Sequence, residues 1–218
     1  MTVPAPPRPL TTPIIEVVPA GTILFRAHAL TLSHATNPGN VFNPGIGART
    51  RFAFFGDPTV PVLYAGQNPE TAVFESVFHN TMPGSVVTSP DWQTKVVTAL
   101  RVNRDLTLAV FHSAGLRRYD LHARDLTDTP AETCGDTVAW AEAIHADATA
   151  TTGDSVVGMV WMSRQFNTDR AYVFFGDRVT DTDLTPVDGH PGSRDFLVPD
   201  DAEWVRALAD RINVTLLG

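Results

Sequence analysis

The chain has 218 residues, of which 43% are hydrophobic and 18% charged. This length predicts one domain or at most two, and the apolar fraction excludes disorder of the whole chain. The formal net charge of −8 argues against a protein that coats nucleic acid or an anionic membrane through a general field. An anionic ligand must therefore meet a local group of basic residues, and we expect no direct binding to nucleic acid or membrane.

Cysteine and histidine usage limits the covalent and metal chemistry of the chain. Cys134 is the single cysteine, so neither an intrachain disulfide nor a thiolate metal cluster is expected. The seven histidines do not occur at metal-ligand spacing, and we predict no metal site. The longest apolar stretch, from Val156 to Met162, is far shorter than the ~20 residues of a spanning helix. We expect a soluble protein of the reducing cytoplasm.

Proline and charge are unevenly distributed along the chain. Six prolines lie within the first nineteen residues, which predicts a disordered or extended arm over residues 1–20 and one folded domain over residues 21–218. Residues 1–118 carry nine basic and six acidic groups (+3), whereas residues 119–218 carry seven and eighteen (−11). We therefore expect the basic group in the N-terminal half. Lys95 is the only lysine among the sixteen basic residues.

The predicted elements, in chain order, mix strands and helices irregularly. Short β-branched or aromatic runs predict strands over residues 22–26, 62–65, 95–102, 107–110, 156–162 and 171–175. Helical spacing predicts helices over residues 69–80, 137–148 and 201–213, with Asn68, Asp136 and Asp200 as N-caps. The last two strands form an antiparallel hairpin pattern. An α+β fold with small, mostly antiparallel sheets and flanking helices is favoured over a doubly wound parallel sheet.

Residues 49–80 hold the side chains with the most chemical content. Arg49 and Arg51 are two apart, so in an extended segment both would point to one side and form a guanidinium pair suited to phosphate. Tyr64 ends a predicted strand, and Glu75 follows in an apolar helical segment where an acid is costly to bury without a partner. Each feature by itself also has an ordinary explanation as a solvated or packed residue. The combination of these features is a more specific signal of function than any one of them.

These residues together resemble the RES domain, a family named for its Arg, Glu and Ser. The resemblance rests on five features in the same order along the chain. An early strand ends in Arg26, and a Gly-x-Arg-x-Arg-Phe run follows at Gly47 to Phe52. Then come the pair Leu63 and Tyr64, a helical Ala-x-x-Glu at Ala72 to Glu75, and a late strand before Ser163 and Arg164. It covers about residues 21–176 and is most specific around Tyr64 and Glu75. Residues 83–154 follow no motif of the family.

The resemblance implies an ADP-ribosyltransferase-like fold and an activity that destroys NAD by phosphorolysis or hydrolysis. RES proteins are the toxin halves of toxin–antitoxin pairs and are held silent by an Xre-type antitoxin. NAD is then a substrate and not a cofactor, with inorganic phosphate as the co-substrate of phosphorolysis. The loops between Thr31 and Pro44, or the C-terminal helix, are the expected contact surface for the antitoxin. The number of subunits stays open, and a homo-oligomer is one alternative.

The resemblance also assigns roles to site residues. Glu75, Arg51 and Ser163 are the expected catalytic residues. Departure of nicotinamide as a neutral base needs no general acid, so one carboxylate, Glu75, suffices to stabilise the positive charge that develops on the ribose. Arg26 and Arg51 are the first choices to hold the pyrophosphate of NAD or inorganic phosphate.

The remaining expected substrate contacts come from three other side chains and from Ser163 itself. Arg49 and Arg164 are expected beside the first two arginines. Tyr64 would stack on nicotinamide or adenine, and Ser163 would hydrogen-bond the ribose or the amide.

Two other functions stay open. One is transfer of ADP-ribose to a macromolecule; the pair of acids typical of arginine-modifying transferases is absent around Glu75. The other is a catalytically inactive nucleotide- or partner-binding module, which would bind without turnover.

Overall fold

The computed structural model describes residues 2–32, 35–153 and 155–218. In this part of the chain the main sheet has nine strands, in the order β1-β8-β9-β10-β5-β2-β7-β11, with β12 also paired to β7. All of its pairs are antiparallel except β8 with β9. The strands are β1 (Ile15–Val18), β2 (Ile23–Ala29), β5 (Val62–Gly66), β7 (Lys95–Val102), β8 (Leu106–Val110), β9 (Val156–Met162), β10 (Arg170–Phe175), β11 (Leu184–Pro186) and β12 (Arg194–Asp195).

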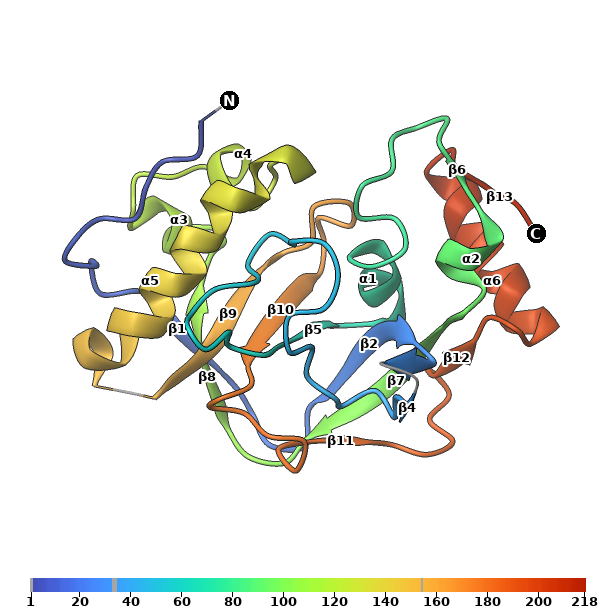
Figure 1. The fold of residues 1–218 in the computed structure, drawn as a ribbon, viewed down its shortest axis with the longest axis horizontal. Helices are drawn as coiled ribbons and strands as arrows, with labels where there is room; N and C mark the ends of the chain where they lie inside the picture. The colour runs from blue at the N-terminus through green and yellow to red at the C-terminus, as the bar shows by residue number, and fades with distance from the viewer. Residues whose placement is uncertain (1, 33–34, 154) are drawn as a thin grey trace.

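Helices lie in two groups on the sheet (Figure 1). One group, beside β8 and β9, comprises α3 (Ala114–Arg117), α4 (Ala123–Leu126) and α5 (Cys134–Thr152). The other, beside β2 and β7, comprises α1 (Pro69–Phe74), α2 (Ser89–Trp92) and α6 (Pro199–Arg211). Two small sheets pair β3 (Thr31–Leu32) with β4 (Ala35–Thr36) and β6 (Val86–Val87) with β13 (Thr215–Leu216).

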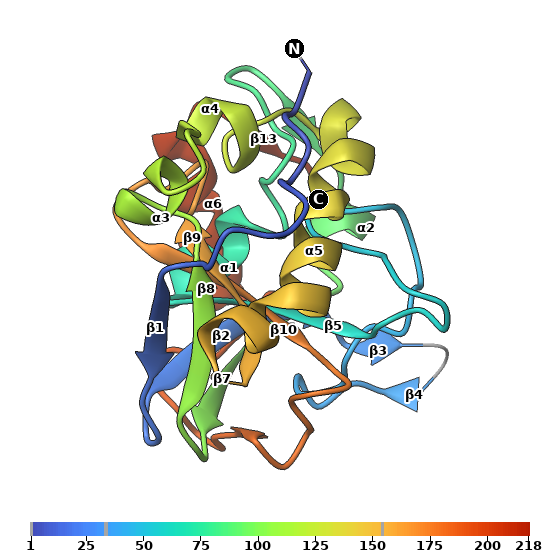
Figure 2. The ribbon, with the colours of Figure 1, turned by 90° about the vertical axis from the view of Figure 1, so that its left-hand side faces the viewer.

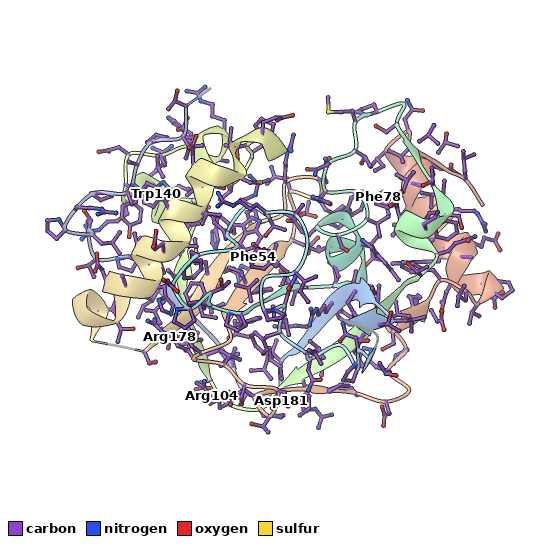
Figure 3. The ribbon with its side chains drawn as sticks, viewed as in Figure 1. Phe54, Phe78, Arg104, Trp140, Arg178 and Asp181 are labelled. Carbon is purple, nitrogen blue, oxygen red and sulfur yellow. The ribbon has the colours of Figure 1, made fainter. Side chains whose placement is uncertain are left out.

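Three buried clusters hold these layers together. Under α5, Trp140 and Ile144 pack with Phe111 and Trp161 of the sheet, and under α1 and α6, Phe74 and Phe78 pack with Val205 (Figure 3 labels Trp140 and Phe78). The third cluster joins side chains of strands from both ends of the sheet: Val18, Leu24, Leu100 and Leu108. The sheet therefore curls, and Figure 2 shows β1, β8, β2 and β7 close together.

The six predicted strands are all present, and β9 and β10 form the predicted antiparallel hairpin. Asn68 caps α1 as predicted, with its Oδ1 accepting from the amide of Thr71 at 2.8 Å. The predicted caps Asp136 and Asp200 are wrong: Thr133 and Val198 precede the two helices. Both aspartates lie instead in the first turn, where a negative charge favours the helix dipole.

Two predicted boundaries also differ. The first helix ends at Phe74 and not at Asn80, because the carbonyl of Val73 accepts from the amides of Ser76, Val77 and Phe78 and the helix closes in tight turns. The expected boundary at residue 21 does not separate an arm from the sheet. Residues 15–18 form β1 on β8, and the side chains of Val3 and Leu10 are buried against the α5 group.

Candidate active site

A cavity opens where the main sheet divides between β2 and β5. These strands share one residue pair, Phe25 with Gly66, and the residues on either side of the split line a cavity of about 350 Å³. Its polar lining includes every candidate site residue except Ser163: Arg26, Arg49, Arg51, Tyr64, Glu75 and Arg164. The acid and the cations thus share one cavity, as the sequence predicts.

Glu75 is fixed at the C-terminal end of α1. It is the C-cap of the helix, and its Oε1 accepts a hydrogen bond from Ser163 Oγ at 2.7 Å and from the amide of Arg164 at 3.1 Å. Both bonds fall on one oxygen, which leaves Oε2 for a ligand. In the described residues no ion pair within 4.0 Å joins Glu75 to an arginine or lysine, so the carboxylate is held by neutral donors.

Ser163 has a different place from the one expected. Its side chain is 0% exposed, donates to Glu75 and accepts from the amide of Phe166 at 3.3 Å. It does not line the cavity. Ser163 therefore orients the carboxylate, and the expected contact of its hydroxyl with the substrate is not supported by this position.

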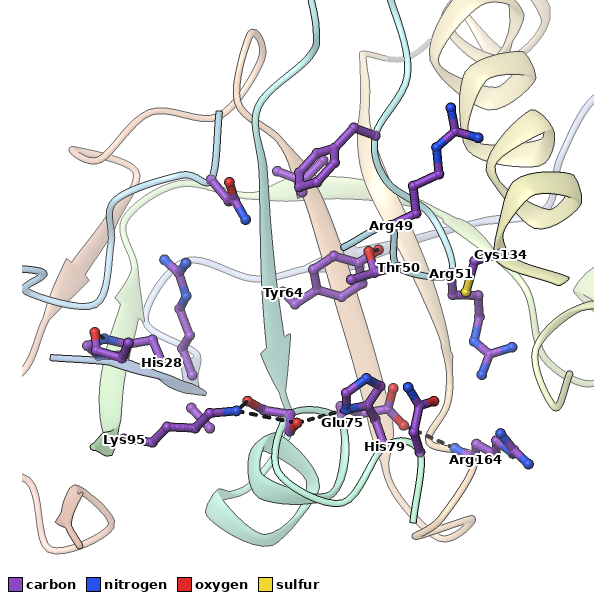
Figure 4. Close-up of a pocket in the computed structure, with 18 of the residues that line it drawn as sticks. His28, Arg49, Thr50, Arg51, Tyr64, Glu75, His79, Lys95, Cys134 and Arg164 are labelled. Atoms are coloured by element: carbon purple, nitrogen blue, oxygen red, sulfur yellow. Dashed lines mark hydrogen bonds between the residues drawn. The ribbon is translucent and has the colours of Figure 1, made fainter. Parts of the chain in front are cut away.

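Arg51 also lines the cavity, on the same side of the Glu75 carboxylate as Arg164 (Figure 4). Its Nη1 donates to the carbonyls of Leu126 and Thr129, both at 3.1 Å, and to Thr129 Oγ1 at 2.7 Å. Burial lowers the pKa of Arg51, and the charge of Glu75 opposes that change. The three bonds to Nη1 fix the guanidinium, and its other nitrogens are left for an anion.

Arg49 does not form the expected pair with Arg51. The segment is not extended: Thr50 and Ala53 pair with each other in a tight turn, and the two guanidinium groups point away from one another in Figure 4. Arg49 is exposed at the rim of the cavity. The predicted guanidinium pair is wrong because it required an extended segment, in which residues two apart point to the same side, and the chain forms a turn here instead.

Arg26 and Arg164 each use part of the guanidinium group for hydrogen bonds or an ion pair within the protein. Arg26 is 9% exposed, and its Nη1 donates to the carbonyls of Gly39 at 2.8 Å and Val41 at 2.6 Å. Burial lowers the pKa of Arg26 to about 10, which keeps it cationic at neutral pH. Arg164 Nε pairs with Asp128 Oδ1 at 3.1 Å.

Tyr64 presents its ring to the cavity while its hydroxyl is engaged with the protein. The hydroxyl accepts from the amide of Phe52 at 3.0 Å and shares a hydrogen bond with Thr50 Oγ1 at 2.9 Å. Burial raises the pKa of Tyr64. The ring packs edge-on against Trp161, with centroids 6.0 Å apart. This leaves a fixed aromatic surface, which fits the expected stacking role.

Sequence reasoning missed several residues of the cavity. They are polar or reactive side chains from separate elements: His28, His79, Lys95, Cys134 and Gln165. Burial lowers the pKa of His28 to about 4, so its imidazole is neutral at physiological pH. For Lys95 a signal was present, because it is the only lysine in the chain. His28, His79 and Gln165 lie within four residues of Arg26, Glu75 and Arg164, so their neighbourhood in sequence was a signal, whereas Cys134 is distant in sequence and only the fold brings it to the cavity.

A family model of the RES domain matches residues 23–196. The chain belongs to the RES-domain family. The match extends through residues 83–154, where the sequence showed no motif. No protein with a curated description matches the chain.

The RES chain also resembles a solved structure. It is a chain of the MbcT–MbcA toxin–antitoxin complex of M. tuberculosis, with a TM-score of 0.50, 13% sequence identity, and coverage of 90% of this chain and 91% of that one. The mixed sheet and its flanking helices confirm the expected α+β class, and the likeness shows that the two chains share this fold. Among the described helices, none has the length and apolar character that a bilayer crossing requires.

Proposed function

We propose that this RES-domain protein is a toxin that consumes NAD by breaking the bond between nicotinamide and ribose. The observation that carries the proposal is the carboxylate of Glu75, held by Ser163 and the Arg164 amide, in one cavity with Arg26 and Arg51. Family membership is in keeping with this activity class, and the likeness to a chain of a toxin–antitoxin complex is in keeping with the role of a toxin.

The chemistry needs one acid and a binding site for phosphates. Nicotinamide leaves as a neutral base with the electron pair of the glycosidic bond, so no proton donor is required. Glu75 Oε2 accepts from a ribose hydroxyl and stabilises the positive charge that grows on the sugar, an interaction that strengthens in the transition state. The guanidinium groups of Arg26 and Arg51 neutralise the pyrophosphate.

The attacking group is inorganic phosphate or water. Attack of a phosphate oxygen on the ribose carbon gives ADP-ribose 1-phosphate and nicotinamide, whereas attack of water gives ADP-ribose, nicotinamide and a proton. Incubation of the purified protein with NAD, with and without phosphate, followed by separation of the products, distinguishes the two. Label from NAD that appears on protein or nucleic acid would instead indicate a transferase, and binding without turnover an inactive module.

An enzyme that consumes NAD must be restrained in its own cell, and we place it in the cytoplasm with an Xre-type antitoxin as partner. The expected contact surface is either the segment from Thr31 to Pro44, of which residues 33–34 lie outside the described residues, or α6. The segment borders the cavity through Thr31, Asn37 and Asn43. A cognate antitoxin at saturation should block NAD turnover; full turnover in its presence would contradict a partner that covers the cavity.

Glu75→Gln tests the catalytic assignment. The amide keeps the shape of the side chain but lacks the negative charge, so we expect kcat for NAD cleavage to fall about 100-fold or more at unchanged thermal stability. Glu70→Gln, in the first turn of the same helix and outside the cavity, is the matched control and should keep its activity. Wild-type kcat in Glu75→Gln would refute the assignment.

A further inference from the structure

Lys95 is the one lysine of the chain, and the mechanism above does not use it. It is the first residue of β7, paired with Ala29 of β2, and its side chain lines the cavity. Figure 4 shows its ammonium on one side of Glu75, with Arg51 and Arg164 on the other. The cavity thus has positive charge on both sides of the carboxylate.

The contacts of Lys95 leave hydrogen-bonding capacity for a ligand. Nζ lies 3.0 Å from Ser76 Oγ and 3.5 Å from the Ser76 carbonyl oxygen. An ammonium has three N–H donors, so one is left after these two contacts. Ser76 Oγ accepts from Lys95 and keeps its own hydrogen to donate. The pair therefore offers two donors, one of them charged, at neighbouring positions.

The charge of Lys95 lacks a close carboxylate in the described part of the chain, where no acid forms an ion pair with Nζ within 4.0 Å. Burial lowers the pKa of Lys95, an effect that the charge of Asp91 opposes. The titratable groups that line the same cavity include Arg26, His28, Glu75 and His79. Burial lowers the pKa of His79, and the charge of Lys95 lowers it further. A half-buried ammonium without a paired acid is costly unless an anion joins it.

We propose that Lys95 and Ser76 form a second anion subsite, which takes a phosphate group on the side of Glu75 opposite Arg51 and Arg164. The inference rests on the proposed function for the origin of that group, which is either the pyrophosphate of NAD or inorganic phosphate. With two separate cationic positions, the cavity can hold two anionic groups at the same time. Glu75 lies between these two positions, where it would contact the nicotinamide ribose of bound NAD.

Amine labelling tests the subsite independently of catalysis. Because Lys95 is the only lysine, trinitrobenzenesulfonate can modify one side-chain amine, which mass spectrometry separates from the α-amino group. We expect inorganic phosphate or ADP to slow the labelling of Lys95 about tenfold, and sodium chloride at equal ionic strength to have little effect. Labelling that neither phosphate nor ADP slows would overturn the proposal.

Variants then identify the source of the phosphate group. In Lys95→Met we expect a KM increase of about 10- to 100-fold, the value of a charged hydrogen bond, with partial rescue in Lys95→Arg. A rise confined to the KM for inorganic phosphate assigns the subsite to the attacking group, and a rise in the KM for NAD assigns it to the pyrophosphate. Arg101→Met, exposed on the same strand, is the control. Unchanged KM values for both substrates would contradict the subsite.

The two experiments separate this proposal from the proposed function. If the wild-type protein does not cleave NAD, the proposed function fails, but protection of Lys95 by phosphate or ADP still decides whether the subsite exists. If a Lys95 variant does not fold, as judged by circular dichroism and thermal melting, the labelling of the wild-type protein decides.

Discussion

At the scale of single residues, the orientation of Glu75 depends on a serine that is closed to solvent. Ser163 Oγ and the Arg164 amide hold the same carboxylate oxygen, so the side chain of Glu75 has little freedom to rotate. The motif Arg, Glu and Ser is visible in the sequence, and it identifies Glu75 and Arg51 as members of one cavity. It does not distinguish a serine that binds substrate from one that holds the acid, because that distinction depends on where the hydroxyl lies.

Ser163→Ala tests this positioning role. Loss of a hydrogen bond to a charged group, about 1.5 to 3 kcal/mol, should lower kcat for NAD cleavage about 10- to 100-fold while the KM for NAD changes little. Steady-state kinetics separates the two constants. Ser155→Ala, an exposed serine just before β9, should behave as wild type. A large rise in KM at unchanged kcat would show instead that Ser163 contributes to substrate binding.

At the scale of elements, the short helix α1 carries the acid to the cavity through close contact with β5. Asn68 and Pro69 start the helix, and these signals are local enough to be predicted from sequence. Its early end after Phe74 is not predictable in this way: the chain closes there in tight turns on the Val73 carbonyl, and Phe74 stacks on Phe166, which is distant in sequence, with centroids 5.1 Å apart. Gly66 permits the approach: a Cβ there would lie 2.5 Å from the backbone nitrogen of Ala72.

Gly66→Ala should therefore displace α1. We expect a loss of about 1 to 3 kcal/mol in the free energy of unfolding, from overpacking against the backbone, and a fall in kcat of about 100-fold, from the shift of Glu75. Urea denaturation and NAD kinetics measure the two effects. Gly135→Ala in α5, where a Cβ meets only Arg49 Nη1 at 3.9 Å, is the stability control. Wild-type values of both quantities in Gly66→Ala would contradict the role of this contact.

At the scale of the whole molecule, the proline-rich N-terminal segment is part of the folded domain. Trp140 Nε1 donates to the Pro4 carbonyl at 2.7 Å, and Tyr119 donates its hydroxyl hydrogen to the Thr11 carbonyl at 2.8 Å. Val3 and Leu10 are 7% and 3% exposed. Prolines exclude regular structure but not an extended segment that fills a groove, so composition alone did not predict this docking.

Deletion of residues 2–10 should lower the free energy of unfolding by about 2 to 4 kcal/mol, because two buried aliphatic side chains and a cover for Trp140 are lost. Urea denaturation followed by tryptophan fluorescence measures the loss. The segment does not line the cavity, so kcat should be retained below the melting temperature. Leu10→Ala, which keeps the chain length, should lose a part of the same free energy. An unchanged midpoint for the truncated protein would show that the docking adds no stability.

The sequence by itself determined the six long strands, the start of α1 and the α+β class, and its resemblance to the RES domain grouped Glu75, Arg51, Arg26 and Tyr64, which share one cavity. The elements depend on local periodicity and capping, and the grouping of the residues depends on a motif of several short segments that can be recognised one by one. The tertiary structure alone decided that Arg49 points away from Arg51, that Ser163 holds the acid, and that Lys95 lies on the other side of it. These placements depend on the gap between β2 and β5 and on contacts between residues that are distant in sequence. Local sequence patterns carry no information about the distance between side chains that meet only after folding.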